Sequence, residues 1–126
     1  MLVINCVPLK KLRLLIIDDN RLLCRSLSSY FTGKVKLFKS VNSAEEALSV
    51  LQEVVFDVIV CDYRLAGMNG LKFFEVLEGS EIIAKKILIS AFMDESIRKR
   101  AFVVGVHHTL PKPFNIHEIV SLVTEC

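Results

Sequence analysis

Short apolar runs alternate with amphipathic stretches along almost the whole chain. Five runs rich in apolar and β-branched residues predict strands, over residues 12–17, 35–38, 57–61, 86–90 and 106–110. Stretches in which apolar residues recur every three or four positions predict helices, over 20–31, 43–52, 70–77, 94–104 and 115–124. Five successive strand–helix units are typical of α/β proteins, in which helices cover both faces of a parallel sheet.

Local signals refine several of these elements. The runs 14–17 and 58–61 are apolar at every position, which predicts strands that are buried on both faces. Asn20 is a suitable cap for the first helix, and Gly33 is expected to end it. Ser43 followed three positions later by Glu46 predicts a capping box at the start of the second helix.

Composition narrows the class of protein without naming a function. The chain has 126 residues, the size of one domain, and 52% of them are hydrophobic, which excludes a disordered chain. Sixteen basic and fourteen acidic residues leave a net charge of +2, too small to indicate binding to nucleic acid or to an anionic membrane. No stretch of about 18 residues lacks a charge, so no membrane span is expected.

The four cysteines, Cys6, Cys24, Cys61 and Cys126, are too far apart for a metal or redox pair of the Cys-x-x-Cys type. Two disulfides could form from them. Reduced thiols in the cytoplasm are the expectation for a chain with a core of this size.

Polar side chains collect directly after the predicted strands. Asp18 and Asp19 follow the first run, Asp62 follows the third, Ser90 ends the fourth, and Lys112 lies just past the fifth. Because the carboxyl ends of parallel strands meet at one edge of a sheet, these side chains are expected to converge there.

Such a cluster has a specific chemistry. Three neighbouring carboxylates repel one another unless a cation lies among them, and Mg²⁺ prefers oxygen ligands of this kind. Lys112 can pair with a carboxylate or a phosphoryl oxygen, and Ser90 and the amide of Ala91 can donate hydrogen bonds. Taken singly, an Asp-Asp pair after a strand is usually a turn or a helix cap. The joint placement at four strand ends favours a phosphoryl-transfer site with a carboxylate nucleophile.

The motifs that carry these residues resemble those of the receiver domain of two-component response regulators. They are Leu-Leu-Ile-Ile-Asp-Asp-Asn at 14–20, the segments 57–70 and 87–91, and the segment 105–114, which contains Lys-Pro. The resemblance extends over about residues 12–124. It implies a flavodoxin-like (βα)5 three-layer sandwich whose parallel five-stranded sheet has the order 2-1-3-4-5. The chain is thus expected to be a single receiver domain, with residues 1–11 as an N-terminal extension.

The resemblance also implies an acceptor and a metal site. Asp62 corresponds to the phospho-acceptor, whose carboxylate attacks a phosphoryl group carried on a histidine of a partner. Asp18, Asp19, Asp62 and the backbone carbonyl of Arg64 correspond to the ligands of Mg²⁺.

A second set of residues corresponds to the phosphate-binding and switch groups of the family. These are Ser90, Ala91, Lys112 and Thr109, and Pro113 is a candidate for a cis peptide bond. Thr109 stands where family members usually have an aromatic switch residue. Phe92 lies beside the site, where a bulky side chain could restrict the access of water.

The function implied by the resemblance is phosphorelay signal transduction. A sensor histidine kinase or a histidine phosphotransfer protein would phosphorylate Asp62, and the change would alter a partner-binding surface. A homodimer through the face of the fourth helix, fifth strand and fifth helix is one such outcome. The domain is expected to be cytoplasmic, to bind neither nucleic acid nor membrane directly, and to catalyse only its own phosphorylation and dephosphorylation.

Three alternatives stay open at this point. The first is a receiver-like adaptor that is never phosphorylated, which the presence of Thr109 leaves open. The second is an aspartyl-phosphate phosphatase of the haloacid dehalogenase type, whose Asp-x-Asp pattern is not matched by the adjacent Asp18 and Asp19. The third is a flavodoxin-type flavin module, which needs a hydroxyl-rich phosphate loop after the first strand.

Overall fold

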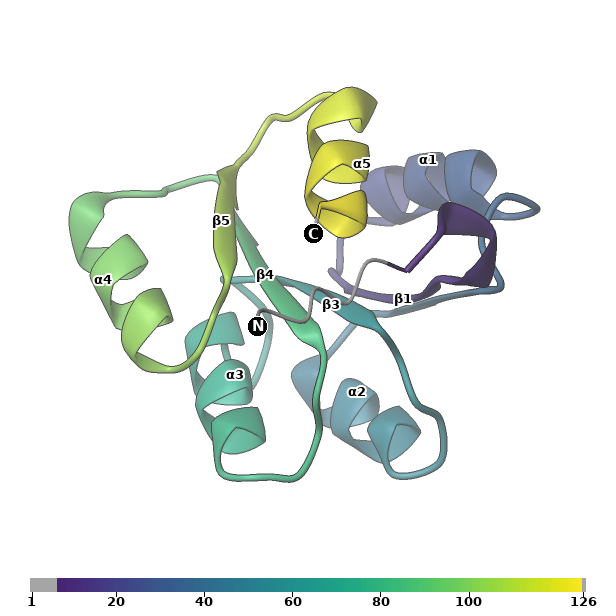
Figure 1. The fold of residues 1–126 in the computed structure, drawn as a ribbon. Helices are drawn as coiled ribbons and strands as arrows, with labels where there is room; N and C mark the ends of the chain where they lie inside the picture. Colours follow the sequence, from purple (N-terminus) through teal and green to yellow (C-terminus); the bar gives the residue numbers. More distant parts are fainter. Residues whose placement is uncertain (1–6, 126) are drawn as a thin grey trace, which may run out of the picture.

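A parallel sheet of five strands lies between two layers of helices in the computed structural model, which describes residues 7–125 (Figure 1). The strands are β1 (Arg13–Ile17), β2 (Leu37–Val41), β3 (Val58–Asp62), β4 (Lys85–Ser90) and β5 (His108–Pro111). Their order is β2-β1-β3-β4-β5, and all neighbouring pairs are parallel. The predicted fold class and strand order are therefore confirmed.

Five helices connect these strands. They are α1 (Arg21–Phe31), α2 (Ala44–Leu51), α3 (Gly70–Glu78), α4 (Glu95–Val103) and α5 (Ile116–Thr124), and a short 3-10 helix (Leu9–Lys11) precedes β1. Helices α1 and α5 cover one face of the sheet, and α2, α3 and α4 pack against the other face (Figure 1). None of these helices, within residues 7–125, has the length and apolar character that crossing a bilayer requires.

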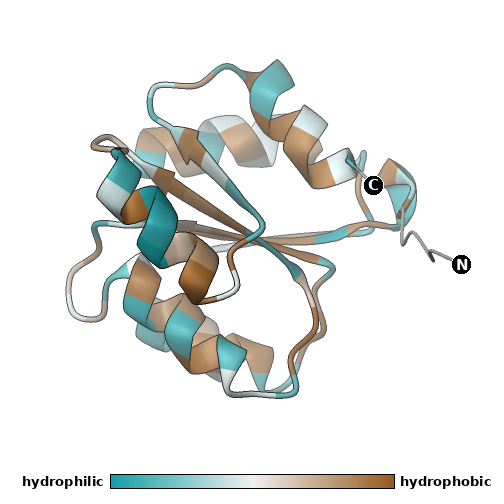
Figure 2. Cartoon of the chain, turned by 60° about the vertical axis from the view of Figure 1, so that its left-hand side comes forward, coloured by the Kyte–Doolittle hydropathy of each residue, from teal (hydrophilic) through white to brown (hydrophobic). Residues whose placement is uncertain are grey.

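The core forms on both faces of the central strands, as the uniform apolar runs predict. Along β1, Leu14 and Ile16 face α1 and α5, whereas Leu15 and Ile17 face the opposite helix layer. All five residues of β3 are buried. Figure 2 shows the corresponding band of hydrophobic residues along the sheet and on the helix surfaces that face it.

Two predicted strands have wrong boundaries. The second was expected at 35–38 but lies at Leu37–Val41, because this edge strand continues through the exposed residues Lys39 and Ser40. The fifth was expected at 106–110 but lies at His108–Pro111. Val106 is buried, but its backbone N–H donates to the carbonyl of Ala101, so it closes the end of α4 rather than pairing in the sheet.

The helix starts follow the sequence signals with one correction. The side chain of Asn20 accepts a hydrogen bond from the Leu23 amide and so caps α1 as predicted. At α2 only half of the predicted capping box forms. Ser43 accepts from the Glu46 amide, but the Glu46 carboxylate accepts from the amide of Asn42 instead of that of Ser43. A complete capping box is found at Asn115.

The cysteine prediction can be examined at two positions. Cys24 and Cys61 are free thiols, the former half-buried and the latter buried. Cys6 and Cys126 lie outside the described residues.

Candidate functional site

Three carboxylates meet at the carboxyl ends of β1 and β3. Asp18 and Asp19 directly follow β1, and Asp62 is the last residue of β3. One carboxylate oxygen from each lies within 4.8 Å of the others. Asp18 and Asp62 are buried, whereas Asp19 is exposed. The convergence expected from the strand ends is thus observed for all three residues.

Lys112 enters this cluster from the loop that follows β5. Its Nζ lies 2.8 Å from Oδ2 of Asp18 and 3.2 Å from Oδ2 of Asp62. Only 18% of the lysine side chain is exposed. The peptide bond between Lys112 and Pro113 is cis, as the resemblance implies. Asp18, Asp19, Asp62 and Lys112 are called the carboxylate site below.

Burial and crowding set the protonation behaviour of the site. Burial raises the pKa of Asp62, the neighbouring charge of Asp18 raises it further, and Lys112 offsets only part of this. Burial opposes the charge of Lys112, but the contacts with Asp18 and Asp62 outweigh it and raise the pKa of the lysine. One ammonium group therefore does not balance the three carboxylates.

The donor set at this site fits a divalent cation with a preference for oxygen. Oδ2 of Asp18 is fully buried and, apart from its ion pair with Lys112, has no hydrogen-bond partner within residues 7–125. The carbonyl oxygen of Arg64, just after β3, accepts no backbone hydrogen bond from the described part of the chain. Carboxylate and carbonyl oxygens with few partners at a crowded anionic site are the ligands that Mg²⁺ takes in proteins.

The last residue of β4, Ser90, is hydrogen-bonded to Lys112 through the backbone. Ser90 is buried, its Oγ accepts a hydrogen bond from the Phe92 amide at 3.0 Å, and its carbonyl accepts from the Lys112 amide at 2.8 Å. Ala91 and Lys112 line a hollow of about 290 Å³ together with Phe114. The structure thus brings Ser90 and Ala91 next to the loop that carries Lys112.

Two side chains stack at the rim of the site. The guanidinium carbon of Arg64 lies 4.9 Å from the centre of the Phe92 ring, which is a cation–π distance. Phe92 is 63% exposed. The pair joins the β3–α3 loop to the β4–α4 loop.

Thr109 is not joined to the carboxylates. It is half-buried on β5, opposite Leu88 of β4. Its hydroxyl makes no hydrogen bond within residues 7–125. The role in switching that the resemblance implies for Thr109 stays a prediction.

The sequence analysis missed two residues that hold the loop after Asp62. Gly70 leaves no room for a side chain, because a Cβ there would press into the carbonyl oxygen of Asp62. The carboxylate of Glu45 accepts a hydrogen bond from the Met68 amide at 2.9 Å and lies against Gly67, which has a φ of +78°. No local signal indicates Glu45, because it is separated from Met68 by 23 positions.

Asp18 is also held by groups that sequence reasoning missed. Its Oδ1 accepts a hydrogen bond from the Asn20 amide at 2.9 Å. Its carbonyl accepts from the thiol of Cys24 at 3.3 Å. These contacts fix the carboxylate at the start of α1.

The fold and this site together define a class of protein. The sequence matches the family model of the response regulator receiver domain over residues 14–124, and the chain belongs to that family.

The relatives and neighbours are consistent with this assignment. The chain is 31% identical over 108 residues to the DNA-binding transcriptional regulator NtrC of Klebsiella pneumoniae, a match that covers 86% of this chain and 23% of that protein. It is similar in fold to the receiver domain of the Francisella response regulator 1452, with a TM-score of 0.83, 23% identity and coverage of 90% and 93% of the two chains. The chemotaxis protein CheY4 of Vibrio cholerae gives a TM-score of 0.81 at 20% identity, with coverage of 90% and 98%. The chain thus spans about a quarter of the length of its NtrC relative.

Proposed function

We propose that this chain accepts a phosphoryl group on Asp62 from a phosphohistidine of a sensor kinase or a histidine phosphotransfer protein. The observation that carries the proposal is the unbalanced charge of the carboxylate site, in which burial and Asp18 raise the pKa of Asp62 in spite of Lys112. Such a site gains from a divalent cation and from a phosphoryl group that Lys112 can hold. The receiver family supports the same assignment.

The transfer exchanges one bond to phosphorus for another. A carboxylate oxygen of Asp62 forms the new P–O bond while the P–N bond to the imidazole of the partner breaks, and the imidazole leaves with the electron pair and takes up a proton. Asp18, Asp19, Asp62 and the carbonyl of Arg64 would hold Mg²⁺, which supplies positive charge for the transferred oxygens. Lys112 and the amide of Ala91 would orient the phosphoryl group by charge and hydrogen bonding.

The consequence of phosphorylation would be a change of surface. The new phosphate competes for Lys112, which now pairs with Asp18 and Asp62, and draws on the hydroxyl of Ser90, which now accepts from the Phe92 amide. Both residues are continuous with β4 and β5, so the face of α4, β5 and α5 is the one they would change. We propose that this face binds a partner or a second copy of the chain.

We also propose a limited catalytic activity and a cellular location for this domain. The domain would catalyse only its own phosphorylation and dephosphorylation and would act without direct binding to nucleic acid or membrane. We place it in the cytoplasm, which the free thiols of Cys24 and Cys61 support.

Labelling with a small phosphodonor tests the proposal. The wild type, incubated with Mg²⁺ and acetyl phosphate, is expected to gain one acyl phosphate that hydroxylamine removes, and a chelator should prevent the reaction. Asp62→Asn should not be labelled. Asp57→Asn is the matched control and should leave labelling intact, because Asp57 directly precedes β3, at the opposite end from Asp62. Equal labelling of Asp62→Asn would overturn the acceptor, and an unlabelled wild type would favour the adaptor alternative.

A further inference from the structure

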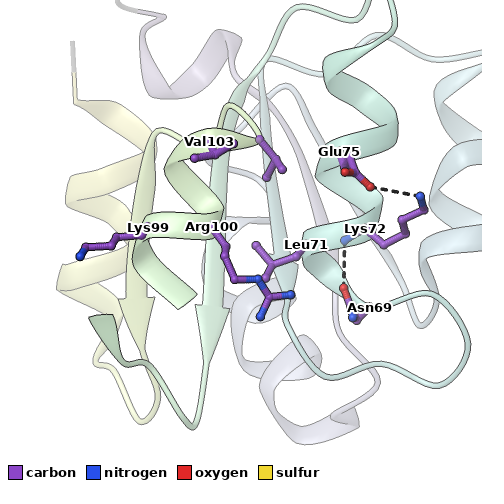
Figure 3. Close-up of a pocket in the computed structure, with 8 residues that line it drawn as sticks. Asn69, Leu71, Lys72, Glu75, Lys99, Arg100 and Val103 are labelled. Atoms are coloured by element: carbon purple, nitrogen blue, oxygen red, sulfur yellow. Dashed lines mark hydrogen bonds and ion pairs between the residues drawn. The ribbon is translucent and has the colours of Figure 1, made fainter. Parts of the chain in front are cut away.

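A groove with a volume of about 500 Å³ lies between α3 and α4, lined by residues other than those of the carboxylate site (Figure 3). Leu71 on α3 and Val103 and Val104 at the end of α4 form its apolar wall. Asn69 and Arg100 contribute polar groups. A volume of this size accommodates several side chains or a small molecule.

Arg100 is the unbalanced charge in this groove. Figure 3 shows its side chain reaching from α4 toward Leu71 and Asn69, whereas Lys99 points away. Lys72 and Glu75, which also line the groove, compensate each other, because Lys72 Nζ lies 3.1 Å from Oε1 of Glu75. Arg100 takes part in no ion pair or side-chain hydrogen bond within residues 7–125.

The surrounding surface of α4 has the same character. Arg98, Lys99 and Arg100 against the single acid Glu95 give this nine-residue helix a charge of +2, which equals the net charge of the whole chain. On the same helix, after the buried Ala101, Phe102 is 80% exposed and Val103 is 77% exposed. Adjacent cations and exposed apolar side chains mark a binding surface better than either feature alone.

We propose that the groove between α3 and α4 binds an acidic peptide segment of a partner protein, with a carboxylate on Arg100 and an apolar side chain against Leu71 and Val103. Charge complementarity selects the acidic partner, and the guanidinium can hold a carboxylate through two parallel hydrogen bonds. The exposed apolar residues select a peptide over a free small anion, which would leave Val103 uncovered. Because none of these groups belongs to the carboxylate site, the unphosphorylated chain should bind such a peptide.

Fluorescence anisotropy with a synthetic peptide tests this site. The probe is a labelled Glu-Glu-Leu-Phe-Glu-Asp peptide added to the full chain without phosphodonor. Arg100→Glu should weaken binding at least about tenfold, the effect expected for loss of a central arginine contact. Arg98→Glu makes the same charge change on the same helix outside the groove and should weaken it less than about threefold.

Two further comparisons separate the alternatives. A peptide with serine in place of leucine and phenylalanine should bind at least about tenfold more weakly, because the apolar wall then has no counterpart. Asp62→Asn should bind the probe like the wild type. The peptide test therefore remains valid even if Asp62 is not the phospho-acceptor. The proposal is overturned if the wild type does not bind, if Arg98→Glu and Arg100→Glu weaken binding equally, or if the serine peptide binds as well as the original.

Discussion

Charged side chains of the same kinds lie where the parallel strands begin, called the amino edge below, and where they end, called the carboxyl edge. Their ion pairs differ between the two edges. At the amino edge, Arg13 holds Asp57 with guanidinium nitrogens 3.1 Å from both carboxylate oxygens, and its backbone N–H also donates to this carboxylate. Burial would raise the pKa of Asp57, but the hydrogen bonds from Arg13 outweigh it and lower the pKa. At the carboxyl edge, burial and Asp18 raise the pKa of Asp62.

This difference separates a structural carboxylate from a reactive one. The Asp57 carboxylate accepts three hydrogen bonds from Arg13, so its charge is compensated within the fold without a further cation. Asp62 shares a single lysine with Asp18 and is therefore more stable with an added cation. A residue type that appears at both ends of one strand thus takes its role from the number of its partners.

The largest effect is expected from removal of the lysine. Lys112→Met leaves the carboxylates without a cation of their own, and we expect the phosphorylation rate to fall at least about tenfold. The free energy of unfolding should fall by roughly 1–3 kcal/mol, since buried carboxylate oxygens lose their partner. Rapid-quench labelling and urea unfolding measure the two effects.

The control for this variant is Lys86→Met at the amino edge. Lys86 is also buried, and its Nζ lies 3.4 Å from Glu78. We expect its phosphorylation rate to stay within about twofold of the wild type. A similar loss of rate in both variants would contradict the distinction between the two edges.

Gly70 and Gly105 allow the carboxyl and amino edges of the sheet to be compared by adding one methyl group at each. Gly70→Ala presses a methyl group into the carbonyl of Asp62, and Gly105→Ala presses one into the carboxylate of Glu78 at a residue whose φ is +86°. Both substitutions should lower the free energy of unfolding by roughly 1–3 kcal/mol. Only Gly70→Ala should slow phosphorylation, measured with protein that circular dichroism shows to be folded. Equal slowing by Gly105→Ala would contradict a specific effect at Asp62, because Gly105 lies against Glu78 instead.

Neutralising Asp62 and neutralising Asp57 should change the free energy of unfolding in opposite directions. Without Mg²⁺, Asp62→Asn is expected to raise the free energy of unfolding, because the raised pKa of Asp62 means that its charge is unfavourable in the fold. Asp57→Asn is expected to lower it, because the pKa of Asp57 is lowered. Changes of about 1 kcal/mol are typical of single substitutions and resolvable by urea unfolding.

Added Mg²⁺ provides the control for this pair. It should stabilise the wild type and Asp57→Asn, and should stabilise Asp62→Asn less, because a bound ion adds its binding free energy to the folded state. Destabilisation by Asp62→Asn in the absence of the metal would contradict the account of a crowded site.

The smallest effect concerns pH at the amino edge. Nδ1 of His107 accepts a hydrogen bond from the Lys86 amide at 2.9 Å, and burial and Lys86 lower the pKa of His107 below 6.5. The unfolded chain therefore binds more protons in the window below about pH 6.5, so this contribution to stability is present above that pH and is lost as the pH falls. Urea unfolding at about pH 7.5 and about pH 5.5 measures the loss.

His107→Gln should reduce this dependence, since glutamine does not titrate. The control is the matched substitution His117→Gln at an exposed position of α5, which leaves the contact between His107 and the Lys86 amide in place. The difference between each variant and the wild type is the quantity to compare.

Buried strands could be predicted from the sequence more accurately than exposed ones. The central strands β1 and β3 are apolar at every buried position except Asp62 at the end of β3, and their pattern predicts them within one residue. The edge strand β2 was misplaced because Lys39 and Ser40 face solvent, where the pairing of the backbone leaves no hydrophobic signal.

Some residues of the site could also be predicted from the sequence, and others could not. Asp18, Asp19 and Asp62 could be brought together from the sequence because parallel strands end at one edge. The support of the site by Glu45 and the fit of Gly70 against Asp62 could not, because both depend on contacts between segments distant along the chain. The groove at Arg100 likewise arises from the packing of α3 against α4 and has no sequence motif.

Chemical trapping of the acyl phosphate identifies the acceptor residue directly. Borohydride reduces an aspartyl phosphate to homoserine, and tandem mass spectrometry of the digested chain locates the changed residue among the three carboxylates of the site. After reaction with Mg²⁺ and phosphodonor, the account predicts homoserine at position 62 alone and none when a chelator is present. Homoserine at position 18 or 19, or at none of the three in a labelled chain, would contradict it.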